Sequence, residues 1–182
     1  MQDLKIFKNL FNVEDKVALV TGGGTGIGKI ISEILALTGS KVYITSRKLD
    51  IIKKTAEEIN LKKPKHKVNF FSSDMSSETG INELVENFLN NEKYLNILVN
   101  NSGISWGAPL GDFPYHAWER VMKLNVAGLF HLTQSLLPNI SSKATLENPS
   151  RIINIGSVMG TAPLGSGPYS YSASKAAVHQ IT

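Results

Sequence analysis

Short apolar runs alternate along the chain with segments whose apolar residues recur every three or four positions. The runs are typical of buried strands. They fall at residues 17–20, 41–45, 67–72, 95–100 and 151–155. The helical spacing predicts helices over residues 27–38, 49–60, 78–89 and 117–137, and a last helix that begins near Tyr169 and is still running at Thr182. Pro138 should close the fourth helix, because Pro has no N–H to continue it.

This strict strand–helix alternation indicates an α/β fold, with right-handed crossovers and helices on both faces of one parallel sheet. We expect one domain over residues 1–182. Two loops rich in Gly and Pro, residues 103–114 and 156–168, directly follow apolar runs. They should therefore lie at the carboxyl edge of the sheet, where open α/β folds bind ligands.

A glycine-rich loop, residues 21–28, joins the first strand to the first helix. Glycine lets backbone N–H groups approach a pyrophosphate, and the helix N-terminus adds partial positive charge. The G-x-G-x-x-G pattern is not met, because Ile27 stands at its third glycine. A P-loop is disfavoured because Ile30 stands where Ser or Thr would hold magnesium. We expect a dinucleotide here, with a tight turn that binds nothing as the alternative.

The end of the second strand indicates which dinucleotide binds. NAD-binding proteins place Asp or Glu there to accept from the ribose 2′-OH. This chain has Ser46, Arg47 and Lys48 instead, and Asp50 should already lie in the next helix. A guanidinium can bind a 2′-phosphate that a carboxylate would repel. The sequence therefore favours NADP over NAD.

Tyr171 and Lys175 lie four residues apart in the last predicted helix, so both should lie on one face. A neighbouring ammonium favours the phenolate form of a Tyr, which helps it to exchange a proton with a substrate oxygen. Ser157, just after the fifth strand, could donate a hydrogen bond to a carbonyl oxygen. An ordinary surface pair is the alternative for Tyr171 and Lys175. A serine hydrolase is disfavoured because Ser157 lies outside any G-x-S-x-G motif.

Composition narrows the function classes further. The chain has no Cys, its four His show no metal spacing, and no apolar run is long enough to span a membrane. Of the net charge of +4, residues 41–67 carry +6, with nine basic and three acidic residues, and the rest carries −2. A solvated helix face and loop explain this segment, or a local anion site at its start. A nucleic-acid surface would need interleaved aromatic residues, which are lacking.

Taken together, these motifs resemble the short-chain dehydrogenase/reductase family. They are the T-G-x-x-x-G-x-G loop, residues 100–103 (N-N-S-G), Asn125, Ser157, Tyr171 and Lys175, in that order, and the likeness runs from about residue 13. The resemblance implies a Rossmann-type, doubly wound parallel sheet with strand order 3-2-1-4-5. Ser102 replaces the family's usual Ala, a small change.

The resemblance also implies residue roles. Tyr171 would protonate the alkoxide oxygen, and Lys175 would lower the pKa of that Tyr and hold the nicotinamide ribose. Ser157 would polarise the carbonyl. Asn125 would carry a water linking Lys175 to solvent, or else be a polar residue inside a helix that bonds to nearby backbone. Asp74 would bind the adenine amino group, or else only neighbour a helix N-cap, and Asn101 would bind near the adenosine ribose. The cofactor-binding set is Gly22, Gly24, Thr25, Gly26, Ile27, Gly28, Ser46, Arg47, Lys48, Asp74, Met75, Asn101, Gly103, Tyr171 and Lys175.

Within the family, the chain is similar to the 3-oxoacyl reductases linked to rhamnolipid synthesis and their fungal relatives. Residues 105–108, 118–122, 147–149, 155–158 and 174–180 carry this likeness. It implies that NADP(H) serves the reduction of a ketone, such as a 3-oxoacyl thioester, to a secondary alcohol. Small ketones, quinones, sugars and steroids are the alternative substrates. Non-catalytic dinucleotide binding, or a truncated fragment that only interacts with partners, remains a different class of function.

Family members usually have about 250 residues. We therefore expect these residues to be part of a longer protein. Its remaining C-terminal part would contain two further strands, a substrate lid and much of the oligomer interface. The fifth strand supports this expectation, because residues 152–155 are too apolar for a bare edge strand. The resemblance implies a homotetramer or homodimer at full length. The absence of Cys, and the lack of a secretory signal in residues 1–5, favour a cytoplasmic location, with a mitochondrial one as the alternative.

Overall fold

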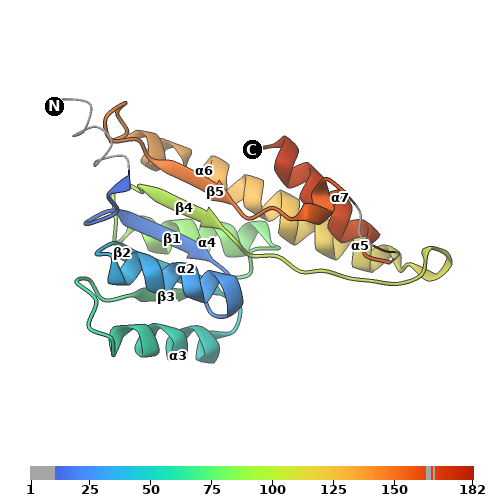
Figure 1. The fold of residues 1–182 in the computed structure, drawn as a ribbon, viewed down its shortest axis with the longest axis horizontal. Helices are drawn as coiled ribbons and strands as arrows, with labels where there is room; N and C mark the ends of the chain where they lie inside the picture. The colour runs from blue at the N-terminus through green and yellow to red at the C-terminus, as the bar shows by residue number, and fades with distance from the viewer. Residues whose placement is uncertain (1–10, 163–164, 166) are drawn as a thin grey trace.

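Five parallel strands form the centre of the structure, a computed structural model that describes residues 11–162, 165 and 167–182. Their order across the sheet is β3-β2-β1-β4-β5. The strands are β1 (Val17–Thr21), β2 (Lys41–Ser46), β3 (Asn69–Ser72), β4 (Ile97–Asn100) and β5 (Arg151–Asn154). Figure 1 shows β4 and β5 above β1 and β2, with β3 below. The predicted α/β class and strand order are confirmed.

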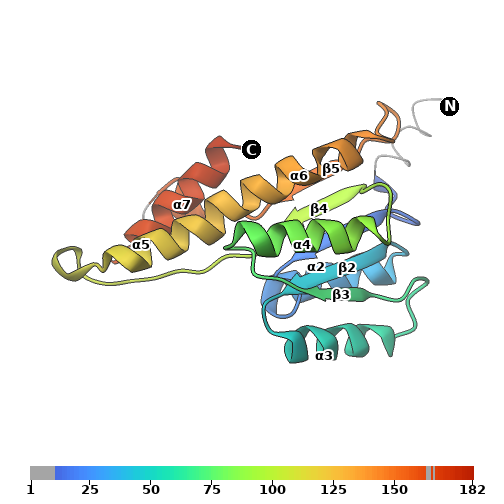
Figure 2. The same cartoon turned by 180° about the vertical axis from the view of Figure 1, so that it is seen from behind.

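Helices cover both faces of the sheet. Helices α2 (Gly26–Leu37) and α3 (Leu49–Asn60) pack on one face, and Figure 1 shows α2 in front of the sheet and α3 below it. Helices α4 (Glu78–Leu89) and α6 (Leu129–Ser141) lie on the opposite face, which Figure 2 turns toward the viewer. Helix α5 (Tyr115–Met122) leads into α6 through a π-helical segment, Lys123–Gly128, and α7 (Tyr169–Gln180) packs beside α5. Two short 3-10 turns, Leu110–Asp112 and Val158–Gly160, complete the elements.

Alternate strand residues supply two hydrophobic cores. Val20 and Ile44 point to the side covered by α2 and α3, where they pack with Ile52 and Ile59. Residues of the opposite parity, such as Leu19, point to the side covered by α4 and α6. This side contains the fully buried residues Leu84, Phe88, Leu95, Leu98, Leu132 and Leu136. Because both faces are buried, the strands read as continuous apolar runs.

The fourth predicted helix differs from the structure at both ends and in its middle. Helix begins at Tyr115, and it continues past Pro138 to Ser141. Pro138 removes one helix donor, but tertiary contacts hold the last turn. The N–H of Leu95 donates to the Asn139 carbonyl at 3.2 Å, and Ile140 is buried in the core. Pro138 was therefore wrongly predicted as the end of this helix.

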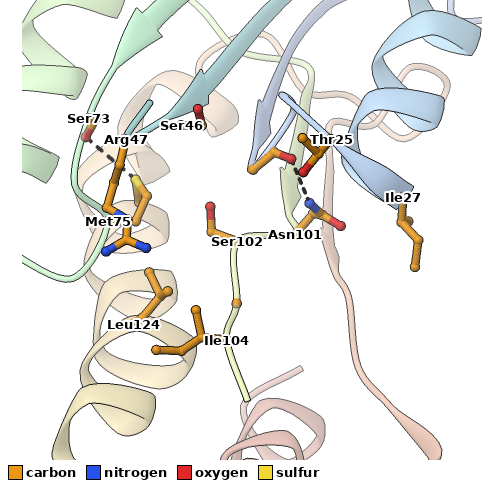
Figure 3. Close-up of a pocket in the computed structure, with 12 residues that line it drawn as sticks. Thr25, Ile27, Ser46, Arg47, Ser73, Met75, Asn101, Ser102, Ile104 and Leu124 are labelled. Atoms are coloured by element: carbon orange, nitrogen blue, oxygen red, sulfur yellow. Dashed lines mark hydrogen bonds between the residues drawn. The ribbon is translucent and has the colours of Figure 1, made fainter. Parts of the chain in front are cut away.

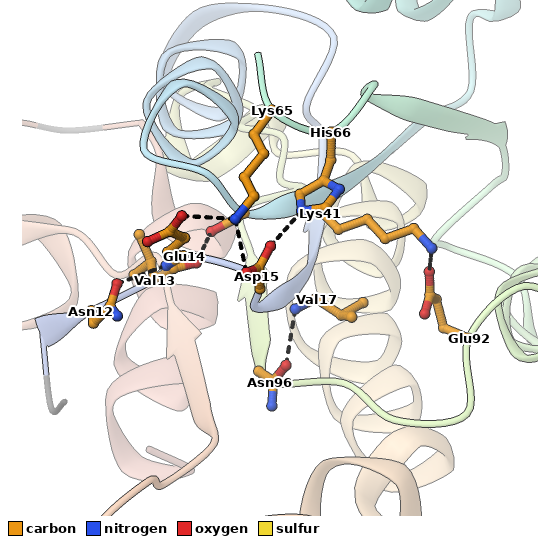
Figure 4. Close-up of polar contacts among 11 residues, drawn as sticks. Asn12, Val13, Glu14, Asp15, Val17, Lys41, Lys65, His66, Glu92 and Asn96 are labelled. Carbon is orange, nitrogen blue, oxygen red and sulfur yellow. Dashed lines mark hydrogen bonds and ion pairs between the residues drawn. The ribbon is translucent and has the colours of Figure 1, made fainter.

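Polar contacts hold the amino edge of the sheet, as Figure 4 shows. Asp15, whose φ is +58°, accepts a hydrogen bond from Lys65 at 2.9 Å and contacts His66 at 2.7 Å. These contacts tie the start of β1 to the loop before β3. The N–H of Val17 donates to the side-chain oxygen of Asn96 at 2.9 Å, which sets β1 against β4. None of these residues belongs to the predicted site.

Some predictions fall outside the described residues. Residues 1–10, which include the opening segment used to predict a cytoplasmic location, lie outside them, as do residues 163, 164 and 166 of the loop 156–168. Within the described part of the chain, every helix is too short or too polar to cross a membrane. β5 lies at one edge of the sheet, and Ile153 on it is 44% exposed.

We predict that Gly128→Ala destabilises the protein. A Cβ at Gly128 would lie 1.9 Å from the carbonyl oxygen of Met75, so the π-helical segment or the loop before α4 would have to move. Such overpacking costs about 1–3 kcal/mol. Urea unfolding of the full chain measures it. Gly111→Ala is the matched control, because a Cβ there meets nothing within 4 Å. Equal unfolding midpoints for the two variants would contradict this packing.

Candidate active site

The ends of β1 and β4 are tied together at the carboxyl edge of the sheet. The Thr21 hydroxyl oxygen accepts the backbone N–H groups of Asn101 at 3.0 Å and Ser102 at 2.9 Å. The Asn101 side-chain amide donates to the Thr21 carbonyl at 3.0 Å. The strand order reverses between β1 and β4, and open α/β sheets bind ligands at such a point. The glycine-rich loop, residues 21–28, begins at Thr21, next to these contacts.

The glycines of this loop serve different purposes. Gly22 has a φ of +65°, which favours glycine, and a Cβ at Gly28 would lie 2.3 Å from the Gly22 carbonyl oxygen. The backbone conformation at Gly22 and the packing at Gly28 therefore require glycine whether or not a ligand binds. At Gly24 a Cβ would find ordinary space, with its nearest neighbour 3.4 Å away, and this glycine lines a cavity instead. The Thr25 side chain makes no cap bond, so the first N–H groups of α2 are available to a ligand.

A cavity of about 340 Å³ lies between the glycine loop and the end of β4, as Figure 3 shows. It is lined by Gly22, Thr25, Ile27, Ser46, Arg47, Ser73, Met75, Asn101, Ser102, Gly103, Ile104 and Leu124. A second cavity of about 250 Å³ is lined by Gly22, Gly24, Thr25, Ser46, Arg47, Lys48 and Ile51. Four residues line both, so the two form one extended surface.

Ten of the predicted cofactor-binding residues line these cavities, and five do not. The five are Gly26, Gly28, Asp74, Tyr171 and Lys175. Asp74 instead accepts hydrogen bonds from the backbone and hydroxyl of Ser76, at 2.9 and 2.7 Å, in the turn before α4. Burial works against the charged form, but the Ser76 bonds and the positive charges of Arg47 and Arg120 lower the pKa of Asp74. These contacts are those of a residue next to a helix N-cap.

Lys175 is buried beside the first cavity. Its Nζ donates to the Ile155 carbonyl at 2.5 Å and lies 5.8 Å from the centre of the Tyr171 ring. A Cβ at Gly103, which lines the cavity, would be 3.8 Å from the same Nζ. Burial lowers the pKa of the Lys175 ammonium. The structure therefore brings Lys175, Tyr171 and the cavity wall together.

The Asn125 side chain joins the cavity wall to α7. Its oxygen accepts the N–H of Ile104 at 2.9 Å, and its amide donates to the Ile104 carbonyl at 2.9 Å and to the Ser174 hydroxyl at 2.9 Å. Ser174 in turn donates to the Tyr171 carbonyl at 2.7 Å. Asn125 lies in the π-helical segment, a feature often found at functional sites. The predicted water carried by Asn125 stays a prediction.

Ser157 follows β5 and begins the 3-10 turn Val158–Gly160. Its hydroxyl oxygen accepts the N–H of Met159 at 3.2 Å, which leaves the hydroxyl proton available to a substrate. Its own N–H donates to Nε2 of His179 on α7 at 3.3 Å. The turn packs against α7, the helix that carries Tyr171 and Lys175. All four predicted catalytic residues thus belong to connected elements around one edge of the sheet.

Several residues that line the cavities were not among the predicted cofactor-binding residues. Ser73, Ser102, Ile104 and Leu124 line the first cavity, and Ile51 lines the second. Figure 3 shows the Ser102 hydroxyl pointing into the open centre of the cavity. Ser102 and Ile104 flank the predicted Gly103, so their place beside it was the available signal. Ser73 and Leu124 likewise directly precede the predicted residues Asp74 and Asn125.

We predict that Lys175 makes the free energy of unfolding depend on pH in the alkaline range. Its pKa is lower in the folded state, so the unfolded chain binds more protons between that lowered pKa and the ordinary value of 10.5. The free energy of unfolding should therefore rise with pH across this window, relative to Lys175→Met. Denaturant unfolding of both proteins at several pH values measures the difference. A difference independent of pH would contradict the buried ammonium.

Known proteins resemble most of this chain in sequence and in fold. The chain is 41% identical over 172 residues to the 3-oxoacyl-(acyl-carrier-protein) reductase of rhamnolipid biosynthesis from Pseudomonas aeruginosa, covering 94% of this chain and 66% of that protein. It is similar to the solved RhlG/NADP active-site complex of Pseudomonas aeruginosa, with a TM-score of 0.89 and 40% identity, over 95% of this chain and 66% of that one. The chain thus spans slightly less than two thirds of the length of these relatives.

A more distant likeness joins the chain to a sugar reductase. The L-sorbose reductase of Gluconobacter frateurii, solved with NADPH and L-sorbose, has a TM-score of 0.85 and 26% identity, over 92% of this chain and 62% of that one. The family model for short chain dehydrogenases matches residues 16–182. The chain therefore belongs to the short chain dehydrogenase family.

Proposed function

We propose that this protein is an NADPH-dependent oxidoreductase that reduces a ketone to a secondary alcohol. One observation carries the proposal. The buried Lys175 ammonium lies beside Gly103, and Gly103 also lines the glycine-loop cavity. A proton-transfer pair and a cavity suited to a dinucleotide thus share one wall. The relatives named above support the same class of reaction.

The cavity residues suit a phosphorylated dinucleotide. The uncapped N-terminus of α2 offers backbone N–H groups to a pyrophosphate. Arg47 and Lys48 supply positive charge for a 2′-phosphate, and no Asp or Glu is among the described residues that line either cavity. When bound, NADPH supplies the hydride that reduces the carbonyl carbon. The solved relatives that contain NADP or NADPH support this choice of cofactor.

The chain's own side chains would move the proton. The Tyr171 hydroxyl would give its proton to the substrate oxygen, with the Lys175 ammonium favouring the phenolate that remains. The Ser157 hydroxyl would donate a hydrogen bond to the same oxygen as negative charge develops there. Asn125 would hold α7 against the cavity wall through Ser174 and Ile104. Non-catalytic dinucleotide binding would require none of this proton-transfer set.

The substrate we propose is a 3-oxoacyl thioester. The 41% identical relative named as a 3-oxoacyl reductase supports it. A sugar or another small ketone is the second candidate, supported by the L-sorbose reductase. Turnover by the full chain, followed as loss of NADPH absorbance with an acetoacetyl thioester, plain ketones and ketose sugars, distinguishes them. Absence of turnover with every carbonyl would contradict the proposed function.

We predict that Tyr171→Phe lowers kcat by about 100- to 10,000-fold, the usual contribution of a general acid. Phe keeps the ring but cannot donate the proton. Tyr169→Phe is the matched control, because Ala173, not Lys, lies one turn after it. Steady-state kinetics of both variants on the same ketone measure the effect. If Tyr171→Phe keeps wild-type turnover, the proton donor is a different group.

The substitution Arg47→Asp should shift the cofactor preference from NADPH toward NADH. We predict that NADPH affinity falls about 10- to 100-fold, the loss expected for a charge-assisted hydrogen bond, while NADH affinity changes little. Fluorescence titration with each cofactor measures both constants. Lys67→Asp, in the same basic segment but outside both cavities, controls for net charge. Equal losses of affinity for NADPH and NADH would contradict the proposal that Arg47 binds the 2′-phosphate.

A further inference from the structure

His179 contacts the loop that carries Ser157, although the sequence analysis assigned it no role. Its Nε2 accepts the Ser157 N–H at 3.3 Å. His179 lies one helical turn after Lys175 and two turns after Tyr171 on α7. One helix therefore carries the proton donor, its ammonium partner and a ring that contacts the backbone of the carbonyl-binding serine.

Two glycines make room for this ring. A Cβ at Gly156 would lie 2.4 Å from Nε2 of His179. A Cβ at Gly160 would lie 2.8 Å from Cε1 of the same ring and 2.7 Å from the backbone of Lys175. The loop 156–160 can approach α7 so closely only because both positions lack side chains. His179 is exposed to solvent, and its ring lies against the loop at both glycines.

The hydrogen bond identifies which ring nitrogen faces the loop. The Ser157 N–H donates to Nε2, so in this contact Nε2 offers its lone pair to the Ser157 peptide group. The Ser157 N–H points toward α7, while the Ser157 hydroxyl accepts from Met159. Rotation of the Ser157 peptide group would turn that hydroxyl away from its present direction. His179 holds this peptide group from the side of α7.

We propose that His179 is a positioning residue, which holds the Ser157 peptide group in register with Tyr171 and Lys175 through its Nε2 acceptor. The inference rests on the proposed reductase function for its kinetic consequence. Remote misplacement of a catalytic group by about 1 Å can lower the rate about 100-fold. A residue acting only in this way affects the chemical step and leaves the cofactor cavity, at the glycine loop, unchanged.

The kinetic test compares His179→Leu with His179→Gln in the full chain. Leu fills similar space without an acceptor, so kcat should fall about 10- to 100-fold while the KM for NADPH stays within about twofold. Gln offers an acceptor oxygen near the position of Nε2 and should keep most of kcat. Gln180→Leu, at the next exposed position of α7, is the matched control. Equal kcat for the Leu and Gln variants would overturn the proposal.

A double-mutant cycle tests the contact itself. Gly156→Ala should lower kcat in the wild-type background, because its Cβ would displace the ring. In a His179→Ala background the ring is absent, so Gly156→Ala should cause little further loss. The same fold-loss in both backgrounds would overturn the proposed contact.

Hydrogen exchange separates this inference from the proposed function, because it needs no turnover. The Ser157 N–H should exchange faster in His179→Leu than in wild type or His179→Gln, as measured by NMR. Unchanged exchange in His179→Leu overturns the role of His179 even if the protein reduces ketones. Faster exchange in a protein that reduces no carbonyl upholds the contact and contradicts only the reductase function.

Discussion

The buried amide of Asn125 is the interaction on which the site depends most. Asn125 is 1% exposed, and its three hydrogen bonds join the backbone of Ile104, after β4, to Ser174 on α7. Ile104 lines the cavity, whereas Ser174 lies between Tyr171 and Lys175 on the chain. A buried amide left without partners costs about 1–3 kcal/mol, so these contacts favour one arrangement of wall and helix. The cavity and the Tyr171–Lys175 pair are thereby held together.

The burial of Lys175 follows from the same arrangement. The residue is 6% exposed, and a neutral acceptor, the Ile155 carbonyl, is the hydrogen-bond partner of its ammonium in the described structure. A buried charge with a neutral partner is costly, which is why its pKa falls. Such a cost is typical of functional sites, where perturbed groups gather. The ammonium lies 5.8 Å from the centre of the Tyr171 ring and beside Gly103 in the cavity wall.

Local patterns predicted much of this protein. Apolar periodicity predicted the β–α order, the glycine-rich loop and the residues after the second strand predicted part of the cavity lining, and the family resemblance supplied the other predicted residues that line it. Local patterns did not predict features that depend on contacts between distant segments of the chain. Pro138 lies inside α6 because Asn139 and Ile140 are held by other parts of the chain. The π-helical segment around Asn125 also escaped, since apolar spacing does not distinguish it from the α-helix on either side. The predicted oligomeric state and the predicted longer chain stay predictions.

The sequence by itself determined the alternation of strands and helices and the one-turn spacing of Tyr171 and Lys175. These depend on the local geometry of the backbone, with a period of two in strands and 3.6 in helices. Only the tertiary structure decided that Lys175 bonds to Ile155, that Asn125 bonds to Ile104 and Ser174, and that His179 meets Ser157. The partners in these pairs are 20 to 49 residues apart, and all depend on how the crossovers close. No local period carries that information, because contacts between distant segments form only when the sheet and its helices pack together.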